Sequence, residues 1–289
     1  MNSASKILVG TSGWSYEDWD GVFYPLGMDR RREHPLTYLA QYFDMVEINT
    51  SLNEYIKPEW AKVWAKRVDA VNPQFKFTAK LYNSFSHASQ DRPGPTSAAS
   101  INPSHQDEIR VREGLDSLAS TGKLGAVLVQ FPISYRNTPL NREYIGTLAH
   151  RFREFPLAIE LHDDSWNTQE TVRHFSELQI AFCNVDAWPV LESFEGTEYL
   201  TSPIGYVRLN GRGVGTRASY LYNATELKVW VGKIQTIAQD AKAVYVVTNN
   251  IVGAKAVVNG LQLKHMLTGN SLEAPEVLLR QYPNLRQIA

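Results

Sequence analysis

Eight short apolar runs recur along the 289 residues, and this rhythm constrains the fold more than any other feature of the chain. Helical stretches separate most of the runs, and most runs end in polar or ionisable residues. Buried strands that alternate with helices in this number are typical of a (β/α)8 barrel, also called a TIM-type barrel. The runs are Lys6–Gly10, Met45–Asn49, Phe75–Lys80, Gly125–Phe131, Leu157–His162, Ile180–Asp186, Tyr206–Asn210 and Val244–Asn250. Such barrels carry their chemistry at the carboxyl ends of the strands, where these polar residues lie.

A chain of this length fits one α/β barrel or two ordinary domains, and no composition break or internal repeat divides it. We therefore expect a single domain over residues 1–289. The net charge of −1 gives no overall basicity, so a small-molecule partner is expected and nucleic acid is not. No apolar run approaches the roughly 20 residues of a membrane-spanning helix, and no signal peptide is visible. These features predict a cytoplasmic protein without membrane contact, and the lone Cys183 excludes an internal disulfide.

Helical patterns lie between most of the runs. The expected helices are Pro35–Phe43, Pro58–Val71, Ser104–Ser120, Pro139–Phe152, Gln169–Leu178, Thr225–Gln239 and Ala254–Leu267. The second helix carries apolar residues at helical spacing: Trp60, Val63, Trp64 and Val68. We expect these four side chains to face the barrel wall. The irregular segment of residues 82–103 is too long for a turn and is predicted to be an active-site lid or a disordered insertion.

Alternation within the strands selects a charged set that faces the barrel axis, because every second side chain of a strand shares a face. Glu47 and Asn49 share one face of their strand, and the apolar Val46 and Ile48 share the other. The same alternation points other polar side chains inward or places them at strand ends: Lys80, Gln130, Glu160, His162, Asp186, Arg208, Asn210, Asn249 and Asn250. The sequence therefore predicts a cluster of charges at one end of the barrel.

Two interpretations of this cluster remain open. Buried charges are costly unless they are paired, so Glu47, Glu160, Lys80 and Arg208 could form a structural network that neutralises itself. Alternatively, they form a polar pocket that tolerates an anion. The pocket is favoured because the charges converge at the face where barrel enzymes work.

Two loops add further signals. The first loop contains five aromatic residues: Trp14, Tyr16, Trp19, Phe23 and Tyr24. They predict either a small satellite core over the barrel or a stacking wall for a sugar ring or a base. The glycine-rich residues 211–215 are interpreted as a flexible turn, with phosphate binding as the alternative. Of the histidines, His87 and His162 alone lie where a site could use them.

The motifs of the chain occur in the order found in a known family. They are GTSGWSYEDWDGVFYP, VEIN, FKFTAK followed by His87, LGAVLVQFP, AIELHDDSW, VDAW, YVRLNGR and NN-x-x-G-x-x-A. From Gly10 to about Leu267 the chain resembles the domain-of-unknown-function 72 family, also called YecE-like. The resemblance implies a TIM-type barrel and no established reaction. It carries over the following residues: Glu47, Asn49, Lys80, His87, Gln130, Glu160, Trp166, Asp186, Arg208, Asn249 and Asn250.

The chain also departs from the family pattern, which marks it as a divergent member. His162 stands where arginine is common, and Asp163 stands where histidine is common. Asn210 replaces a second histidine, and Thr248 replaces an aromatic residue. Chemistry that requires the missing groups is expected to be altered or lost.

The first functional hypothesis is an enzyme, with hydrolysis as its most concrete reaction, that acts on a sugar-containing or phosphorylated substrate. Glu160 and Glu47 would act as general acid and base, and Lys80 and Asp186 complete the catalytic set. No cofactor is needed for this chemistry. The predicted substrate-binding residues are Trp14, Tyr16, Asn49, His87, Gln130, His162, Trp166, Arg208, Asn210, Asn249 and Asn250.

Two alternatives accompany this hypothesis. One is a metal-dependent phosphoesterase or isomerase similar to endonuclease-four-type barrels. Its oxygen-rich ligands would suit Mg or Mn, and the available set is Glu47, His87, Glu160, His162 and Asp186. The other is a barrel without catalysis that binds a ligand or a partner protein.

Overall fold

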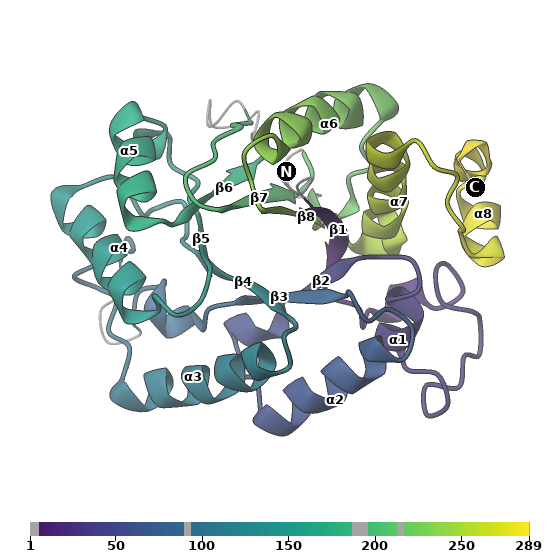
Figure 1. The fold of residues 1–289 in the computed structure, drawn as a ribbon, viewed down its shortest axis with the longest axis horizontal. Helices are drawn as coiled ribbons and strands as arrows, with labels where there is room; N and C mark the ends of the chain where they lie inside the picture. Colours follow the sequence, from purple (N-terminus) through teal and green to yellow (C-terminus); the bar gives the residue numbers. More distant parts are fainter. Residues whose placement is uncertain (1–5, 90–93, 187–195, 213–216, 289) are drawn as a thin grey trace.

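The chain folds into a closed barrel of parallel strands surrounded by helices, as the computed structural model in Figure 1 shows. The structure describes residues 6–89, 94–186, 196–212 and 217–288. The strands are β1 (Lys6–Ser12), β2 (Met45–Ile48), β3 (Lys76–Lys80), β4 (Leu124–Gln130), β5 (Leu157–Glu160), β6 (Ala181–Val185), β7 (Ile204–Leu209) and β8 (Ala243–Thr248). Each strand pairs with the next, and β8 pairs with β1 to close the ring. The predicted TIM-type (β/α)8 barrel is confirmed, and each predicted run overlaps one strand.

Helices cover the outside of the barrel between most successive strands (Figure 1). They are α1 (Pro35–Leu39), α2 (Pro58–Asp69), α3 (His105–Ser120), α4 (Pro139–Arg151), α5 (Gln169–Leu178), α6 (Ala224–Ala238), α7 (Lys255–Thr268) and α8 (Glu276–Gln281). Side-chain caps start several of them. The hydroxyls of Thr138 and Thr168 accept the backbone N–H three residues ahead and so begin α4 and α5. Within the described ranges, no helix is long and apolar enough to cross a membrane.

The amino-terminal half of the barrel interior is an apolar core. Leu8, Met45, Leu128, Cys183 and Tyr245 are buried there and pack against one another across the barrel axis. Leu8, Met45 and Leu128 precede the polar residues of their strands, so they lie nearer the amino ends of those strands. The barrel is therefore filled at this end, and its polar side chains gather at the carboxyl end.

Helix α2 does not present the face that its apolar pattern predicts. Ala61, Ala65 and Val68 are its buried residues. By contrast, Trp60 is 36% exposed and Val63 is 47% exposed. The expectation that both face the barrel wall is wrong, because the buried side of the helix is the one that carries Ala61, Ala65 and Val68.

The segment predicted as a lid is described on both sides of residues 90–93, which lie outside the described residues together with 187–195 and 213–216. The Ser89 N–H donates to the Ser100 carbonyl over 2.8 Å. The Ala98 N–H donates to Asn141 Oδ1 of α4 over 2.7 Å, and the Tyr144 hydroxyl of α4 donates to the Phe85 carbonyl. The described parts of residues 82–103 thus lie against α4. The glycine-rich turn considered for phosphate falls largely within 213–216.

Candidate functional site

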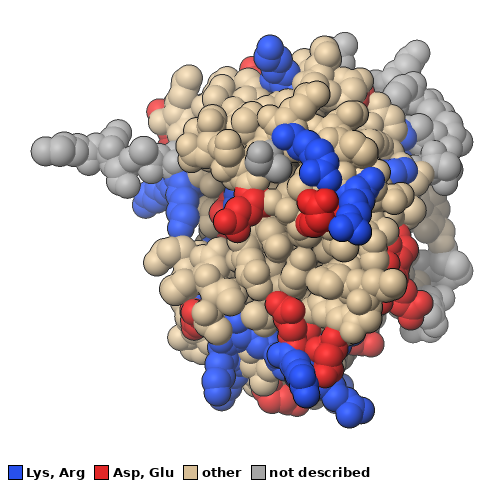
Figure 2. Space-filling model, turned by 90° about the vertical axis from the view of Figure 1, so that its right-hand side faces the viewer, with Lys and Arg blue, Asp and Glu red and all other residues tan. Residues whose placement is uncertain are grey.

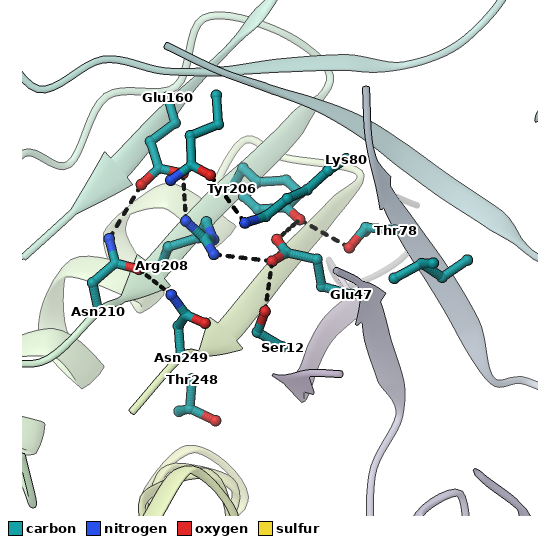
Figure 3. A network of polar contacts seen from close by, with 12 residues as sticks. Ser12, Glu47, Thr78, Lys80, Glu160, Tyr206, Arg208, Asn210, Thr248 and Asn249 are labelled. Carbon is teal, nitrogen blue, oxygen red and sulfur yellow. Dashed lines mark hydrogen bonds and ion pairs between the residues drawn. The ribbon is translucent and has the colours of Figure 1, made fainter. Parts of the chain in front are cut away.

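Polar side chains from most strands meet at the carboxyl end of the barrel and form what we call the polar ring (Figure 3). Its members are Ser12, Glu47, Thr78, Lys80, Gln130, Glu160, Tyr206, Arg208, Asn210 and Asn249. They occupy the inward positions of their strands or the residue after the strand ends. The alternation that fills the lower barrel with apolar side chains therefore supplies the ring two or four residues later.

Arg208 is the centre of the polar ring. Its Nη1 donates to Glu160 Oε2 over 2.5 Å, and its Nη2 donates to Glu47 Oε1 over 3.0 Å. All three side chains are fully buried. The two carboxylates outweigh burial and raise the pKa of Arg208 above its usual value. One guanidinium therefore joins two carboxylates that come from β2 and β5, neither of which is a neighbour of β7.

Glu47 is saturated by protein donors. Its Oε1 accepts from Ser12 Oγ over 3.0 Å as well as from Arg208. Its Oε2 accepts from the Tyr206 hydroxyl over 2.9 Å. The same hydroxyl lies 2.8 Å from Thr78 Oγ1. With each oxygen bound and no exposure, Glu47 is placed to hold the ring together.

Lys80 lies beside this network without an ion pair among the described residues. Its Nζ donates to the neutral Gln130 Oε1 over 2.9 Å, and the residue is 7% exposed. Burial and the Arg208 guanidinium lower the pKa of Lys80, although Glu47 and Glu160 act in the opposite direction. Both carboxylates pair with Arg208, so the ammonium group of Lys80 donates its hydrogen bond to the amide of Gln130 instead.

The second oxygen of Glu160 faces the rim of the barrel. Glu160 Oε1 lies 3.2 Å from His162 Nε2 and accepts from Asn210 Nδ2 over 3.1 Å. Asn249 Nδ2 in turn donates to Asn210 Oδ1 (Figure 3). Burial alone raises the pKa of Glu160, but Arg208, with His162 and Lys80, outweighs it and holds that pKa well below its usual value. Glu160 is therefore an ionised carboxylate that supports a partly exposed imidazole.

Asp186 fixes the loop that follows β7. Its Oδ1 accepts from the Asn210 backbone N–H over 2.8 Å, and its Oδ2 accepts from the Tyr222 hydroxyl. Burial raises the pKa of Asp186 to about 6, despite these hydrogen bonds. Because both oxygens already bind the protein, Asp186 acts on the ring through the position of Asn210.

Comparison with known proteins shows which family this barrel belongs to. The model of the family "Protein of unknown function DUF72" matches residues 8–281. The chain belongs to the DUF72 family. The UPF0759 protein YunF of Bacillus subtilis is 23% identical over 285 residues, which cover 90% of this chain and 94% of that protein.

Solved DUF72 structures have the same fold. A DUF72 family protein from Thermotoga maritima is 28% identical, with a TM-score of 0.75, and the match covers 91% of this chain and 99% of that one. A DUF72 family protein from Enterococcus faecalis is 25% identical, also with a TM-score of 0.75, and the match covers 90% of this chain and 95% of that one. The resemblance inferred from the motifs is thus confirmed.

Two of the four expected departures from the DUF72 pattern meet at one atom. His162 and Asn210 stand where arginine and histidine are common, and both contact Oε1 of Glu160. Glu160 itself keeps its contact with Arg208. Glu160 Oε1 is therefore the atom around which these two expected departures lie.

Two predicted substrate-binding residues of this DUF72 barrel do not reach the polar ring. Trp166 is fully buried, its Nε1 donates to the Tyr135 carbonyl, and its ring stacks on that of Tyr135. Asn250 is also fully buried, and its Nδ2 lies within hydrogen-bond distance of Asn259 Oδ1 and the Tyr220 carbonyl. Both side chains are enclosed by protein atoms and lie apart from the polar ring, and their contact with a substrate stays a prediction.

The remaining predicted residues lie around the ring. His87 is half-buried and pairs with Ser86 Oγ, and burial, together with the charge of Lys80, lowers its pKa. The aromatic loop is divided between two environments. Trp19, Phe23 and Tyr24 are buried in the main hydrophobic core, whereas Trp14, Tyr16 and Asn49 line a cavity beside the ring, where a stacking wall stays a prediction.

Several residues of the site were missed by sequence reasoning. Tyr206 shares the inward face of β7 with Arg208, so the period of two already marked it. Trp60 and Trp64 line the cavity beside the ring. Their spacing of one helical turn predicts a face toward the barrel wall, and nothing in that spacing distinguishes a buried face from the wall of a pocket.

The side chains considered for a metal are not grouped as ligands. Among the described residues, no group of three or more His, Cys, Asp or Glu side chains is arranged to hold a metal ion. The oxygens of Glu47 and Glu160 bind Arg208, and those of Asp186 bind Tyr222 and Asn210. This donor arrangement does not fit the Mg or Mn site of the alternative hypothesis.

Proposed function

We propose that this barrel is an enzyme that acts on a small sugar-containing or phosphorylated substrate by acid–base chemistry at the polar ring. The observation that carries the proposal is the pair formed by His162 and Glu160. A side chain that is 24% exposed lies 3.2 Å from a carboxylate with no exposure. An imidazole oriented by an ionised carboxylate is a common general base and acid.

The geometry supports different roles for the two glutamates from those expected of an acid and a base. Arg208 binds both and keeps Glu160 ionised, so neither is placed to exchange a proton with a substrate. Glu160 would orient the His162 ring through Nε2, which leaves Nδ1 to take or give the proton. Glu160 is then a positioning residue, and His162 is the group that meets the substrate.

Lys80 supports an anionic substrate. Its ammonium group has an amide as its hydrogen-bond partner and no carboxylate within ion-pair distance among the described residues. A phosphate or carboxylate group on the substrate would supply the missing negative charge. Lys80 would thus hold the substrate while His162 acts on it.

The test is a screen of turnover with p-nitrophenyl phosphate and p-nitrophenyl glycosides. His162→Gln is expected to lower kcat/KM by roughly 10²–10⁴-fold, the usual contribution of a general acid or base. His150→Gln, at an exposed position on α4, is the matched control and is expected to keep full activity. Full activity in His162→Gln would overturn the role of the histidine.

A second arm tests the anion. Inorganic phosphate is expected to inhibit the wild-type enzyme competitively, and Lys80→Met is expected to relieve that inhibition. Lys228→Met, at an exposed position on α6, serves as control. Phosphate that inhibits Lys80→Met as strongly as the wild type would remove Lys80 from the proposal. Phosphate binding without turnover of any substrate would favour a binding role over catalysis.

A further inference from the structure

A cavity of about 390 Å³ lies beside the polar ring, between the loop after β1 and the start of α2. Its walls are mainly aromatic: Trp14, Tyr16, Trp60 and Trp64. Asn49 and Glu54 lie among its polar lining residues. The volume falls at the small end of the range for ligand pockets. The cavity is therefore suited to a single small ring.

The tryptophans of this cavity form a corner. Trp14 and Trp64 meet edge to face, with ring centroids 5.4 Å apart and planes at 78°. Trp60 lies 6.1 Å from Trp64 at 41°. A flat nucleobase is best held between parallel rings, and none of these pairs is parallel. A ligand with one apolar face can stack on one indole and meet the next at its edge.

The charges at and near the cavity are one of each sign, Glu54 and Lys57, and favour neither an anion nor a cation. Glu54 contributes a negative charge to the lining, which opposes a phosphate or another anion. Lys57 Nζ already lies 4.6 Å from the centre of the Trp60 ring, so a second cation would be repelled there. Burial raises the pKa of Tyr16 to about 12, so its hydroxyl stays neutral. A neutral ligand is therefore favoured.

The polar lining supplies hydrogen bonds at the edge of that ligand. Asn49 offers an amide donor and acceptor, Thr50 a hydroxyl and Glu54 two acceptor oxygens. The Tyr16 hydroxyl is already committed, because it donates to the Ser12 carbonyl over 2.6 Å. An apolar face with hydroxyl groups around its rim is the chemistry of a pyranose ring.

We infer that this cavity binds the pyranose ring of a neutral sugar, stacked on a tryptophan, with hydroxyls bound by Asn49 and Glu54. Asn49 follows β2 two residues after Glu47, and the Tyr16 hydroxyl of the cavity donates to the carbonyl of Ser12, a residue of the polar ring. If the cavity is a subsite for the non-reacting sugar of a substrate, the inference rests on the proposed function. If the cavity only binds a sugar, the inference does not depend on turnover.

The test is saturation-transfer NMR with the methyl glycosides of glucose, galactose, mannose and N-acetylglucosamine, with adenosine as a competing probe. We expect at least one glycoside to bind, and Trp60→Ala to weaken its affinity about tenfold, equivalent to roughly 1.4 kcal/mol. Trp60→Phe is expected to restore part of the affinity. Leu140→Ala, which removes a 51% exposed side chain on α4, is the control.

Several outcomes would overturn the inference. They are the absence of binding by all four glycosides, binding that survives Trp60→Ala, and preferential binding of adenosine. Light scattering, which measures the mass of the particle, tests whether the tryptophans instead bind a second copy of the chain. If Trp60→Ala changes the mass of the particle and no sugar binds, the tryptophans form an interface between copies of the chain.

The His162→Gln variant distinguishes this inference from the proposed function. His162→Gln is expected to lower kcat/KM as stated above and to leave glycoside binding unchanged, because His162 does not line the cavity. Glycoside binding without turnover in any screen would support the sugar site and contradict the proposed enzyme function. Turnover without glycoside binding would support the enzyme function and contradict the sugar site.

Discussion

Arg208 and Asp186 show how single buried charges set the properties of the barrel interior. Arg208 shares its guanidinium between Glu47 and Glu160, and all three side chains are excluded from solvent. Such a group is weak evidence for stability as a whole, because desolvation offsets attraction. Removing one partner is different, since it leaves charges buried without compensation.

Arg208→Met is therefore expected to lower the free energy of unfolding by about 3–5 kcal/mol, because two carboxylates lose their cation. Urea denaturation at neutral pH measures the change. Arg280→Met, in which the original side chain is 76% exposed, is the control and should stay within about 0.5 kcal/mol of the wild type. Equal stability of Arg208→Met and the control would show that the carboxylates find other partners.

Asp186 is expected to make stability depend on pH with a sign opposite to that of Glu160. Its pKa of about 6 lies above its unfolded value, so the folded state binds the proton more tightly. That contribution is complete below about pH 3.9, the unfolded value, and is lost as pH rises. It is fully lost above pH 6. Glu160 has a lowered pKa, so its contribution is present above about pH 4.3 and lost in acid.

Asp186→Asn removes the contribution of the Asp186 carboxyl group to the pH dependence of stability. The unfolding free energy of Asp186→Asn minus that of the wild type is expected to rise by roughly 1–3 kcal/mol between pH 4 and 7. Urea denaturation at intervals across this range provides the curve. Subtracting the wild-type free energy cancels the contributions of the other titrating groups. His34 is one of them, because burial and the nearby Arg67 and Arg30 lower its pKa to about 4. A difference that does not change with pH would contradict the raised pKa.

At the scale of the elements, the strands were predictable because their apolar runs and their alternation obey local rules. The alternation also selected the inward side of Glu47, Glu160 and Arg208. It did not select partners, because β2, β5 and β7 meet only across the closed barrel. The predicted structural network therefore describes these three side chains and not Lys80, which pairs with Gln130 instead.

The contact between β1 and β2 depends on one glycine. Gly10 pairs with Met45, and a Cβ added to Gly10 would overlap the Met45 carbonyl oxygen. Gly10→Ala is expected to destabilise the protein by about 3 kcal/mol, the upper range for overpacking. Gly232→Ala is the matched control, because a Cβ there meets nothing within 4 Å on α6.

The control is expected to stabilise the protein by about 0.5–1 kcal/mol, since alanine favours the helix. Thermal unfolding of both variants beside the wild type measures the two shifts. If Gly10→Ala is as stable as Gly232→Ala, then β1 can move away from β2 without loss.

The face of the molecule shown in Figure 2 has no dominant charge among its described residues. Lysine and arginine side chains are interspersed with aspartate and glutamate on the face shown in Figure 2, in line with the net charge of −1. A face of mixed sign gives little long-range attraction to a polyanion. Specificity for a charged ligand therefore has to come from individual groups such as Lys80.

A closed ring of strands is expected to unfold as one unit. Far-UV circular dichroism and tryptophan fluorescence should give coincident transitions in urea, because loss of one strand opens the ring and exposes its neighbours. Tryptophans report from several parts of the molecule, including Trp19 in the first loop, Trp166 after β5 and Trp230 on α6. Two separate transitions would show that the chain contains two independent units.

The pairing of β1 with β8 has a consequence for synthesis on the ribosome. β1 emerges first, but its second edge stays without a partner until Ala243–Thr248 has been made, roughly 230 residues later. At about 5–20 residues per second this interval lasts on the order of 10–50 s. During that time the nascent chain carries an open strand edge that neighbouring chains on the same messenger can capture. Completion of the last strand removes this hazard, so the order of the strands makes translation speed and chaperone binding part of how the barrel forms.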